Sequence, residues 1–202
     1  MTDLTPGSSR VIVDISPSAD GFVAGAGVEV GRPFGDAELT LYRWLGLQDD
    51  PTDERDREAA EWQLGDAGAI VLGRTMFDVG IGPWGDDGAF HRPCFVVTNR
   101  SHEPVVKGHT SFTFVEGGPR AAVEAAREAA GDKDVMVVGG ARVIDQCLEE
   151  GLVDEVRMHI APVLLGTGTR LFDNAGRAEL VLIDATAGGQ ALHVRYRVEA
   201  AR

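Results

Sequence analysis

Val135-Met136-Val137-Val138-Gly139-Gly140-Ala141-Arg142-Val143-Ile144 is the stretch that decides the fold prediction. Its first four residues are apolar, which is typical of a parallel strand buried on both faces. Two glycines follow, and a helical pattern then continues to Gly151. Such a turn presents backbone N–H groups at the positive end of a helix, where phosphate binds. The same glycines would also serve a tight turn without a ligand. The pattern is not G-x-G-x-x-G, which disfavours an ordinary dinucleotide-binding Rossmann unit.

A second element of this kind lies upstream, at residues 70–75, where an apolar run ends in Gly73, Arg74 and Thr75. A guanidinium group at a strand end can bind phosphate with two hydrogen bonds, although a surface arginine is the alternative. The next strand ends in Thr98-Asn99-Arg100, which is either a polar turn or part of the same site. Two arginines at neighbouring strand ends suit a 2′-phosphate, and therefore NADPH over NADH. Ligands of such sheets bind at the carboxyl ends of the strands, so we expect one shared pocket there.

Composition restricts the class of protein. The chain has 202 residues, of which 44% are hydrophobic and 25% charged, and we expect one soluble domain over residues 1–202 with residues 1–9 disordered. No apolar run is long enough to span a membrane, and the polar amino terminus has no signal-peptide core, so we expect a cytoplasmic protein that binds no membrane. The net charge of −13 argues against nucleic acid as a partner.

Cysteine and histidine give no sign of a bound metal. Cys94 and Cys147 lie in apolar contexts, which predicts buried, reduced thiols. The five histidines show no metal-ligand spacing, so we predict no metal site.

The remaining pattern predicts an α/β fold with a mostly parallel sheet, helices on its faces and an antiparallel pair of strands at one edge. The antiparallel pair is expected at residues 179–187 and 191–200, around Gly188-Gly189. The other expected strands are residues 11–15, 69–72, 94–98, 113–115, 135–138 and 155–165. The expected helices are residues 38–47, 53–64, 119–130 and 143–150.

Candidate substrate-binding groups fall on two loops and one expected helix. Glu38 is followed by apolar residues, so its pKa could be raised and it could relay a proton; the alternative is a solvated acid in the first turn. Asp36 is the competing acid, or the N-cap of the same helix. Asp20-Gly21, in the long loop of residues 16–35, is a turn signal first and a site signal second. Trp84 is either a pocket wall or a packed loop aromatic.

Taken in order, these elements resemble the dihydrofolate reductase-like superfamily, and within it the C-terminal reductase domain of the bifunctional riboflavin-biosynthesis deaminase/reductase. The match covers nearly the whole chain. The most specific string runs from Gly151 to Gly166. The other matching strings are Ser18–Gly25 (similar to S-x-D-G-x-x-A), Leu72–Asp78, Val96–Arg100 and Val138–Gly140. The resemblance implies a three-layer α/β/α fold of the dihydrofolate reductase type.

The resemblance also implies an NADPH-dependent reductase. In the family, the glycine pair touches the nicotinamide and the diphosphate, polar strand ends hold the 2′-phosphate, and the Asp-Gly loop covers the nicotinamide. The implied cofactor-binding residues are Asp20, Gly21, Val23, Ala24, Gly73, Arg74, Thr75, Thr98, Asn99, Arg100, Gly139, Gly140, Ala141, Arg142 and Val143. On the substrate side, Glu38 matches the pterin-binding acid and is the implied catalytic residue, and Arg92 lies where an arginine holds the folate tail. Asp36 and Trp84 complete the substrate candidates.

Two departures from the family keep alternatives open. Met76 stands where many relatives have a phosphate-contacting threonine, and Val138 stands where riboflavin-pathway reductases have a substrate-contacting glutamate. Our main hypothesis is hydride transfer from NADPH to a pterin or an aminopyrimidine. The alternatives are the riboflavin-pathway reductase, a non-catalytic NADPH-binding or sensor protein, and a protein in which every glycine is structural.

The resemblance further implies a homodimer joined through the sheet edge and the C-terminal region. The apolar alternation of Leu180, Leu182, Leu192 and Val194 permits such an interface.

Overall fold

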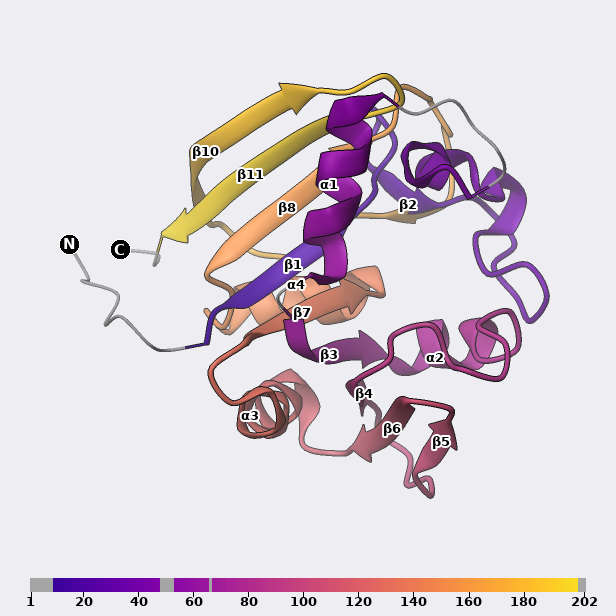
Figure 1. Ribbon diagram of the computed structural model, residues 1–202, viewed down its shortest axis with the longest axis vertical. Helices are drawn as coiled ribbons and strands as arrows, with labels where there is room; N and C mark the ends of the chain where they lie inside the picture. Colours follow the sequence, from indigo (N-terminus) through magenta and orange to yellow (C-terminus); the bar gives the residue numbers. More distant parts are fainter. Residues whose placement is uncertain (1–8, 48–52, 66, 200–202) are drawn as a thin grey trace.

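The computed structural model describes residues 9–47, 53–65 and 67–199, in which nine strands form one large sheet (Figure 1). The order of strands is β10-β11-β8-β1-β7-β3-β4-β6-β5, and neighbours are parallel from β8 through β6. These parallel strands are β1 (Val11–Ile15), β3 (Ala67–Gly73), β4 (Pro93–Val97), β6 (Thr110–Val115), β7 (Asp134–Gly139) and β8 (Glu155–Ile160). The mostly parallel sheet expected from the sequence is confirmed.

Antiparallel strands close both edges of this sheet. At one edge, β10 (Glu179–Ala187) and β11 (Leu192–Glu199) form the expected hairpin, and β11 pairs with β8. At the other edge, the short β5 (Val105–Lys107) pairs with β6. A separate pair joins β2 (Phe22–Ala24) to β9 (Thr169–Arg170). The sequence analysis did not predict β2, β5 or β9, because strands of two or three residues are too short to show a period.

Helices cover both faces of the sheet, which makes three layers. Helices α3 (Gly118–Ala130) and α4 (Ala141–Glu149) pack on the face that carries Val71 of β3. The opposite face carries Leu72 and is covered by α2 (Arg74–Gly80) and α1 (Glu54–Leu64), which lies across β1 and β8 in Figure 1. Because successive residues point to opposite faces, a strand covered on both sides is apolar throughout, as predicted. None of the described helices is long and apolar enough to cross a membrane.

The helix expected over residues 38–47 is wrong. Two short 3₁₀ helices replace it, η1 (Gly35–Ala37) and η2 (Thr40–Leu45), and Glu38 lies between them with a φ of 49°. Leu41 and Trp44 of η2 are fully buried. Between them the backbone of Tyr42 is non-helical, with a φ of −118° and a ψ of 15°, which interrupts the helix. The strand expected over residues 155–165 is also too long, since β8 ends at Ile160, before Pro162, which has no N–H to donate.

The two cysteines behave as expected. Cys94 and Cys147 are buried and form no disulfide bond. Burial raises the pKa of each thiol to about 12, which keeps both protonated and unreactive near neutral pH.

Candidate active site

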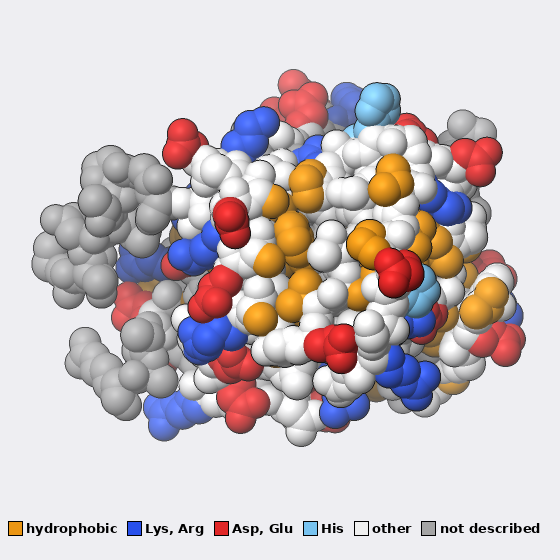
Figure 2. All heavy atoms as spheres, turned by 90° about the horizontal axis from the view of Figure 1, so that it is seen from below, with side chains coloured by type: hydrophobic (Ala, Val, Ile, Leu, Met, Phe, Trp, Pro, Cys, Tyr) orange, Lys and Arg blue, Asp and Glu red, His pale blue; other side chains and the backbone are white. Residues whose placement is uncertain are grey.

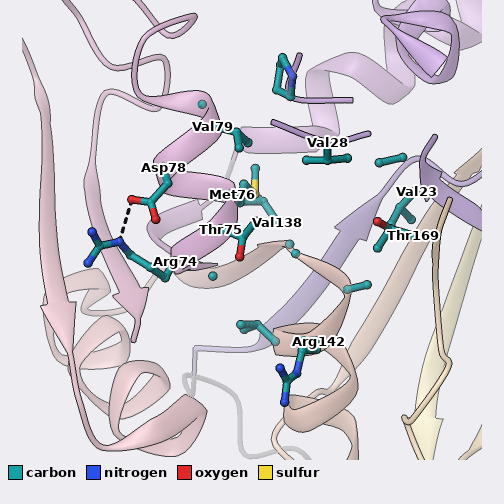
Figure 3. A pocket seen from close by; sticks show the side chains of 18 of the residues that line it. Val23, Val28, Arg74, Thr75, Met76, Asp78, Val79, Val138, Arg142 and Thr169 are labelled. Atoms are coloured by element: carbon teal, nitrogen blue, oxygen red, sulfur yellow. Dashed lines mark hydrogen bonds and ion pairs between the residues drawn. The ribbon is translucent and has the colours of Figure 1, made fainter. Parts of the chain in front are cut away.

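A cleft of about 1290 Å³ opens at the carboxyl ends of β3, β4 and β7 (Figure 3). This is the end of a parallel sheet at which ligands bind. One half of the cleft is formed by the turns that follow these strands, and we call it the arginine end. The other half is formed by the loop after β2, by η2 and by the segment after α2, and we call it the apolar end.

The glycine pair forms the floor of the arginine end. The peptide bond between Gly139 and Gly140 is cis, and Gly139 has a φ of 131°, a conformation that favours glycine. A Cβ atom placed on Gly140 would meet no atom within 4 Å, so the space above it is open to the cleft. Gly140 is also the N-cap of α4 and offers no side chain to the first N–H groups of that helix. Open space, uncapped N–H groups and the helix dipole together suit an anion.

Three arginines stand around this floor, namely Arg74, Arg100 and Arg142. The Nε of Arg74 lies 2.7 Å from the Oδ1 of Asp78, the contact drawn as a dashed line in Figure 3. Among the described residues, no carboxylate pairs with the guanidinium of Arg100 or of Arg142, which leaves both able to bind a phosphate.

Thr98 shapes the turn that presents Arg100. Its buried hydroxyl accepts a hydrogen bond from the N–H of Arg100 at 3.1 Å and donates to the carbonyl of the same residue at 3.2 Å. Residues 98–100 are therefore both a polar turn and part of the cleft, because the turn itself places Arg100 at the cleft.

Apolar and aromatic side chains line the other end of the cleft. The rings of Phe34 and Tyr42 form a tilted pair, with centroids 4.8 Å apart. Trp84 contributes to the opposite wall and packs against Phe112, so it is both a pocket wall and a packed aromatic. The remaining lining residues of this end include Val28, Pro33, Leu39, Leu47, Val79 and Pro83.

A chain of buried polar side chains runs beside this apolar end. It joins Asp14 of β1, His159 of β8, His193 of β11 and Asp56 of α1. The two Nδ1 atoms of the histidines are 2.7 Å apart, and Asp56 lies 3.1 Å from the Nε2 of His193. All four side chains are almost completely buried. The sequence analysis did not predict this row of polar side chains, because only the antiparallel register of β11 on β8 sets His193 opposite His159.

Burial and the charge of Asp14 both affect neighbouring groups. Burial, aided by the nearby Asp14 carboxylate, raises the pKa of Tyr42 above its ordinary value. The Tyr42 ring therefore stays uncharged near neutral pH. Burial lowers the pKa of His193, although its contact with Asp56 opposes this effect.

The cleft brings together most of the predicted site residues. Those that line it are Val23, Ala24, Glu38, Gly73, Arg74, Thr75, Trp84, Thr98, Asn99, Arg100, Gly139, Gly140, Ala141, Arg142 and Val143. Glu38 lies at the apolar end and is exposed, so it is not enclosed by apolar side chains as we expected.

Asp20, Gly21 and Asp36 do not line the cleft. The carboxylate of Asp20 accepts hydrogen bonds from the N–H groups of Leu165 and Gly166, at 3.1 and 2.7 Å, and so ties two loops together. Asp36 accepts a hydrogen bond from the N–H of Ala26 at 2.8 Å. Both acids hold loop backbone. Asp20-Gly21 lies in a turn, as predicted, since the N–H of Gly21 donates to the carbonyl of Ser18. The N-cap prediction for Asp36 is wrong, because Leu39 precedes η2 and no side chain caps it.

Arg92 lies at the other end of the sheet. It precedes β4, and its guanidinium donates hydrogen bonds to the carbonyls of Phe90 and Ala67, at 2.9 and 2.6 Å. These contacts are at the amino ends of β3 and β4, whereas the cleft is at their carboxyl ends. Arg92 therefore fastens backbone and is not part of the candidate substrate site.

Comparison with known proteins agrees with this architecture. The model of the RibD C-terminal domain family matches residues 9–194. The uncharacterized protein YyaP of Bacillus subtilis (strain 168) is 25% identical over 174 residues, which is 81% of this chain and 80% of that protein. The uncharacterized protein YwjB of the same organism is 26% identical over 133 residues, which is 63% of this chain and 71% of that protein.

Solved structures share the fold at low sequence identity. A putative riboflavin biosynthesis protein from Shewanella sp. PV-4 superposes with a TM-score of 0.68 at 21% identity, over 95% of this chain and 99% of that one. A diaminohydroxyphosphoribosylaminopyrimidine deaminase/5-amino-6-(5-phosphoribosylamino)uracil reductase from Thermotoga maritima gives a TM-score of 0.63 at 12% identity, over 95% of this chain and 57% of that one.

Dihydrofolate reductase from Enterococcus faecalis, complexed with NADP(H) and RAB-propyl, gives a TM-score of 0.57 at 13% identity, over 95% of this chain and 97% of that one. The chain has the dihydrofolate reductase-like fold and belongs to the RibD C-terminal domain family.

Proposed function

We propose that the protein is an NADPH-dependent reductase that transfers a hydride to a small heterocycle of the pterin or aminopyrimidine type. The observation that carries the proposal is the cleft itself. One cavity joins an end lined by arginines and the glycine pair to an end lined by apolar and aromatic side chains. A substrate and a dinucleotide that meet in such a cavity are held close enough to react.

The residues of the arginine end fit this cofactor. The open space above Gly140 and the start of α4, which carries Arg142, suit the diphosphate, and Arg100 at the end of β4 suits a 2′-phosphate. The bound nucleotide would supply the hydride, and the protein would supply placement. The Enterococcus faecalis relative, solved with NADP(H), supports the choice of cofactor.

Glu38 is our candidate for proton transfer, because its carboxylate lines the apolar end and is open to solvent. An exposed carboxylate exchanges protons directly with water, so it could pass one to a substrate nitrogen after hydride transfer. If this role is correct, Glu38→Gln lowers the turnover number and leaves the dissociation constant of NADPH unchanged. Unchanged turnover in Glu38→Gln would show that the proton comes from elsewhere.

The decisive assay follows the loss of NADPH absorbance with a panel of pterins and aminopyrimidines. Reduction of at least one compound is the expected result. Binding of NADPH without oxidation across the panel would instead indicate a non-catalytic NADPH-binding protein. Absence of any nucleotide binding would contradict the proposal altogether.

We also propose that the protein forms a homodimer through β10. This strand ends the sheet, and Leu180, Val181, Leu182 and Ile183 on it are all exposed. An unpaired apolar edge strand of this length is rare on a monomer, since it invites pairing with another chain.

A further inference from the structure

The two ends of the cleft differ in charge. The arginine end carries Arg74, Arg100 and Arg142 and one acid, Asp78, which pairs with Arg74, whereas the apolar end carries one arginine, Arg32, and one acid, Glu38. Arg32 is itself near an acid, with its Nη1 4.0 Å from the Oε1 of Glu29. The apolar end therefore offers no cluster of cations to bind a phosphate group.

Further acids surround this end. Residues 25–47, which build most of it, contain the three acids Glu29, Asp36 and Glu38 and only two basic residues, Arg32 and Arg43. The buried carboxylate of Asp14 lies near Tyr42, and its Oδ1 is 3.3 Å from the Nε2 of His159. A phosphate dianion in this half of the cleft would meet one arginine and two carboxylates, Glu38 on the lining and Asp14 near Tyr42, and like charges at short range oppose binding.

Aromatic rings line this end of the cleft. Phe34 and Tyr42 lie on two different segments, yet their ring centroids are 4.8 Å apart. Contacts of Trp44 hold η2, the segment that carries the uncharged ring of Tyr42. The Trp44 ring stacks on His159, with centroids 4.0 Å apart, and its Nε1 donates a hydrogen bond to the hydroxyl of Ser16. A flat ring gains from packing on such a held aromatic surface.

We propose that the substrate of this cleft is a flat ring compound without a phosphate group, bound at the apolar end against Phe34 and Tyr42. This inference rests on the proposed function, because it assigns the arginine end to the cofactor phosphates. It separates the protein from the Thermotoga maritima relative, whose reductase substrate is named as a phosphoribosylamino uracil.

The test measures binding of three matched pairs to the NADP⁺-saturated protein by calorimetry. The pairs are pyridoxine, uridine and riboflavin, each with its 5′-phosphate. Within a pair the ring is identical, so only the phosphate differs. We expect at least one unphosphorylated ring to bind and its phosphate to bind about tenfold more weakly.

Variants then locate the ring. Tyr42→Ala removes the aromatic surface and should weaken binding about tenfold, whereas Tyr42→Phe keeps that surface and should restore it. Arg43→Gln, which changes an exposed neighbour outside the cleft, should leave binding of the unphosphorylated ring unchanged.

Two results would overturn the inference. One is tighter binding of a phosphorylated member, especially if Arg32→Gln abolishes it and Arg43→Gln does not. The other is failure of all three unphosphorylated rings to bind. If NADP⁺ itself does not bind, the proposed function fails at the first titration. Binding of the three compound pairs to the wild type and to the Tyr42 variants is then measured without a nucleotide. Tighter binding of the unphosphorylated member of a pair would still support the inference, and tighter binding of the phosphorylated member would still overturn it.

Discussion

Single residues at the wall of the cleft are fixed by close packing, and Gly80 is one of them. A Cβ atom on Gly80 would lie 2.4 Å from the ring of Trp84, which no side chain tolerates without a shift. Gly80→Ala should therefore lower the free energy of unfolding by about 1–3 kcal/mol, the usual cost of overpacking.

Urea unfolding measures this difference. Gly82→Ala is the matched control, because a Cβ there meets no atom within 4 Å. Equal stability of the Gly80 and Gly82 variants would contradict the packing of Trp84 described above.

Asp20 makes a pH-dependent contact. Hydrogen bonds from the hydroxyl of Ser18 and the N–H groups of Gly166 and Leu165 lower the pKa of Asp20 from 3.8 to about 2. A carboxyl group whose pKa is lower in the folded state stabilises that state above its unfolded pKa, and this contribution is lost as the pH falls through the folded pKa. Asp20 therefore ties its two loops together above about pH 4 and releases them between about pH 4 and 2.

The free energies of unfolding of the wild type and of Asp20→Asn, measured against pH, test this contact. The difference between the two proteins should be constant above about pH 4 and should shrink towards pH 2. A difference that keeps its size down to pH 2, or that changes near neutral pH, would contradict the assignment.

At the scale of elements, Asp56 connects α1 to the sheet and to the hairpin. It completes a capping box with Asp53, accepts hydrogen bonds from the N–H groups of Gly189 and Gln190, and contacts the Nε2 of His193. Asp56→Ala should cost on the order of 3 kcal/mol of unfolding free energy, since it removes a cap and leaves buried donors unsatisfied.

Glu58→Ala is the control for this change, because Glu58 is an exposed acid on the same helix. Denaturant unfolding should show a small effect there. If Asp56→Ala lowers the free energy of unfolding no more than Glu58→Ala does, the contacts of the buried Asp56 side chain contribute little to stability.

Elements with a strong local signal could be predicted from the sequence, and those fixed by distant contacts could not. The apolar run of β7 and the glycines after it showed both the strand and the turn, because two-sided burial leaves a continuous pattern. The segment of η2 shows a helical period, but its turn type follows from the packing of Trp44 on His159.

The candidate site divides in the same way. Arg74, Arg100 and the glycine pair follow strands, so their shared position at one end of a parallel sheet could be inferred. Arg92 precedes a strand, which placed it at the opposite end. Phe34 and Tyr42 were not predicted as a pair, because they meet only through the path of the loop between them.

At the scale of the whole molecule, the free edge of the sheet should set the oligomeric state. Leu182→Lys places a charge on β10, where the native side chain is 58% exposed, so the monomer should fold normally. Analytical ultracentrifugation should show a dimer for the wild type and a monomer for this variant, because charge at an edge strand prevents pairing.

Val106→Lys changes a residue at the opposite edge, on β5, that is even more exposed, and this variant should remain dimeric. A monomeric wild type, or a dimer that Val106→Lys separates and Leu182→Lys does not, would contradict the proposed interface.

The negative net charge of the protein opposes binding of an anionic cofactor. Acidic and basic side chains are interspersed on the face shown in Figure 2, with no continuous basic surface among its described residues. With a net charge of −13, the protein can attract a polyanionic nucleotide only through a local site. The arginine end is that site in our account.

The most direct test is therefore a calorimetric comparison of the dissociation constants of NADPH and NADH for the wild-type protein. The account predicts that NADPH binds at least about tenfold more tightly, because only NADPH carries the 2′-phosphate that Arg100 would bind. Equal affinity for the two nucleotides would contradict the arginine assignment, and no binding of either would contradict the reductase proposal itself.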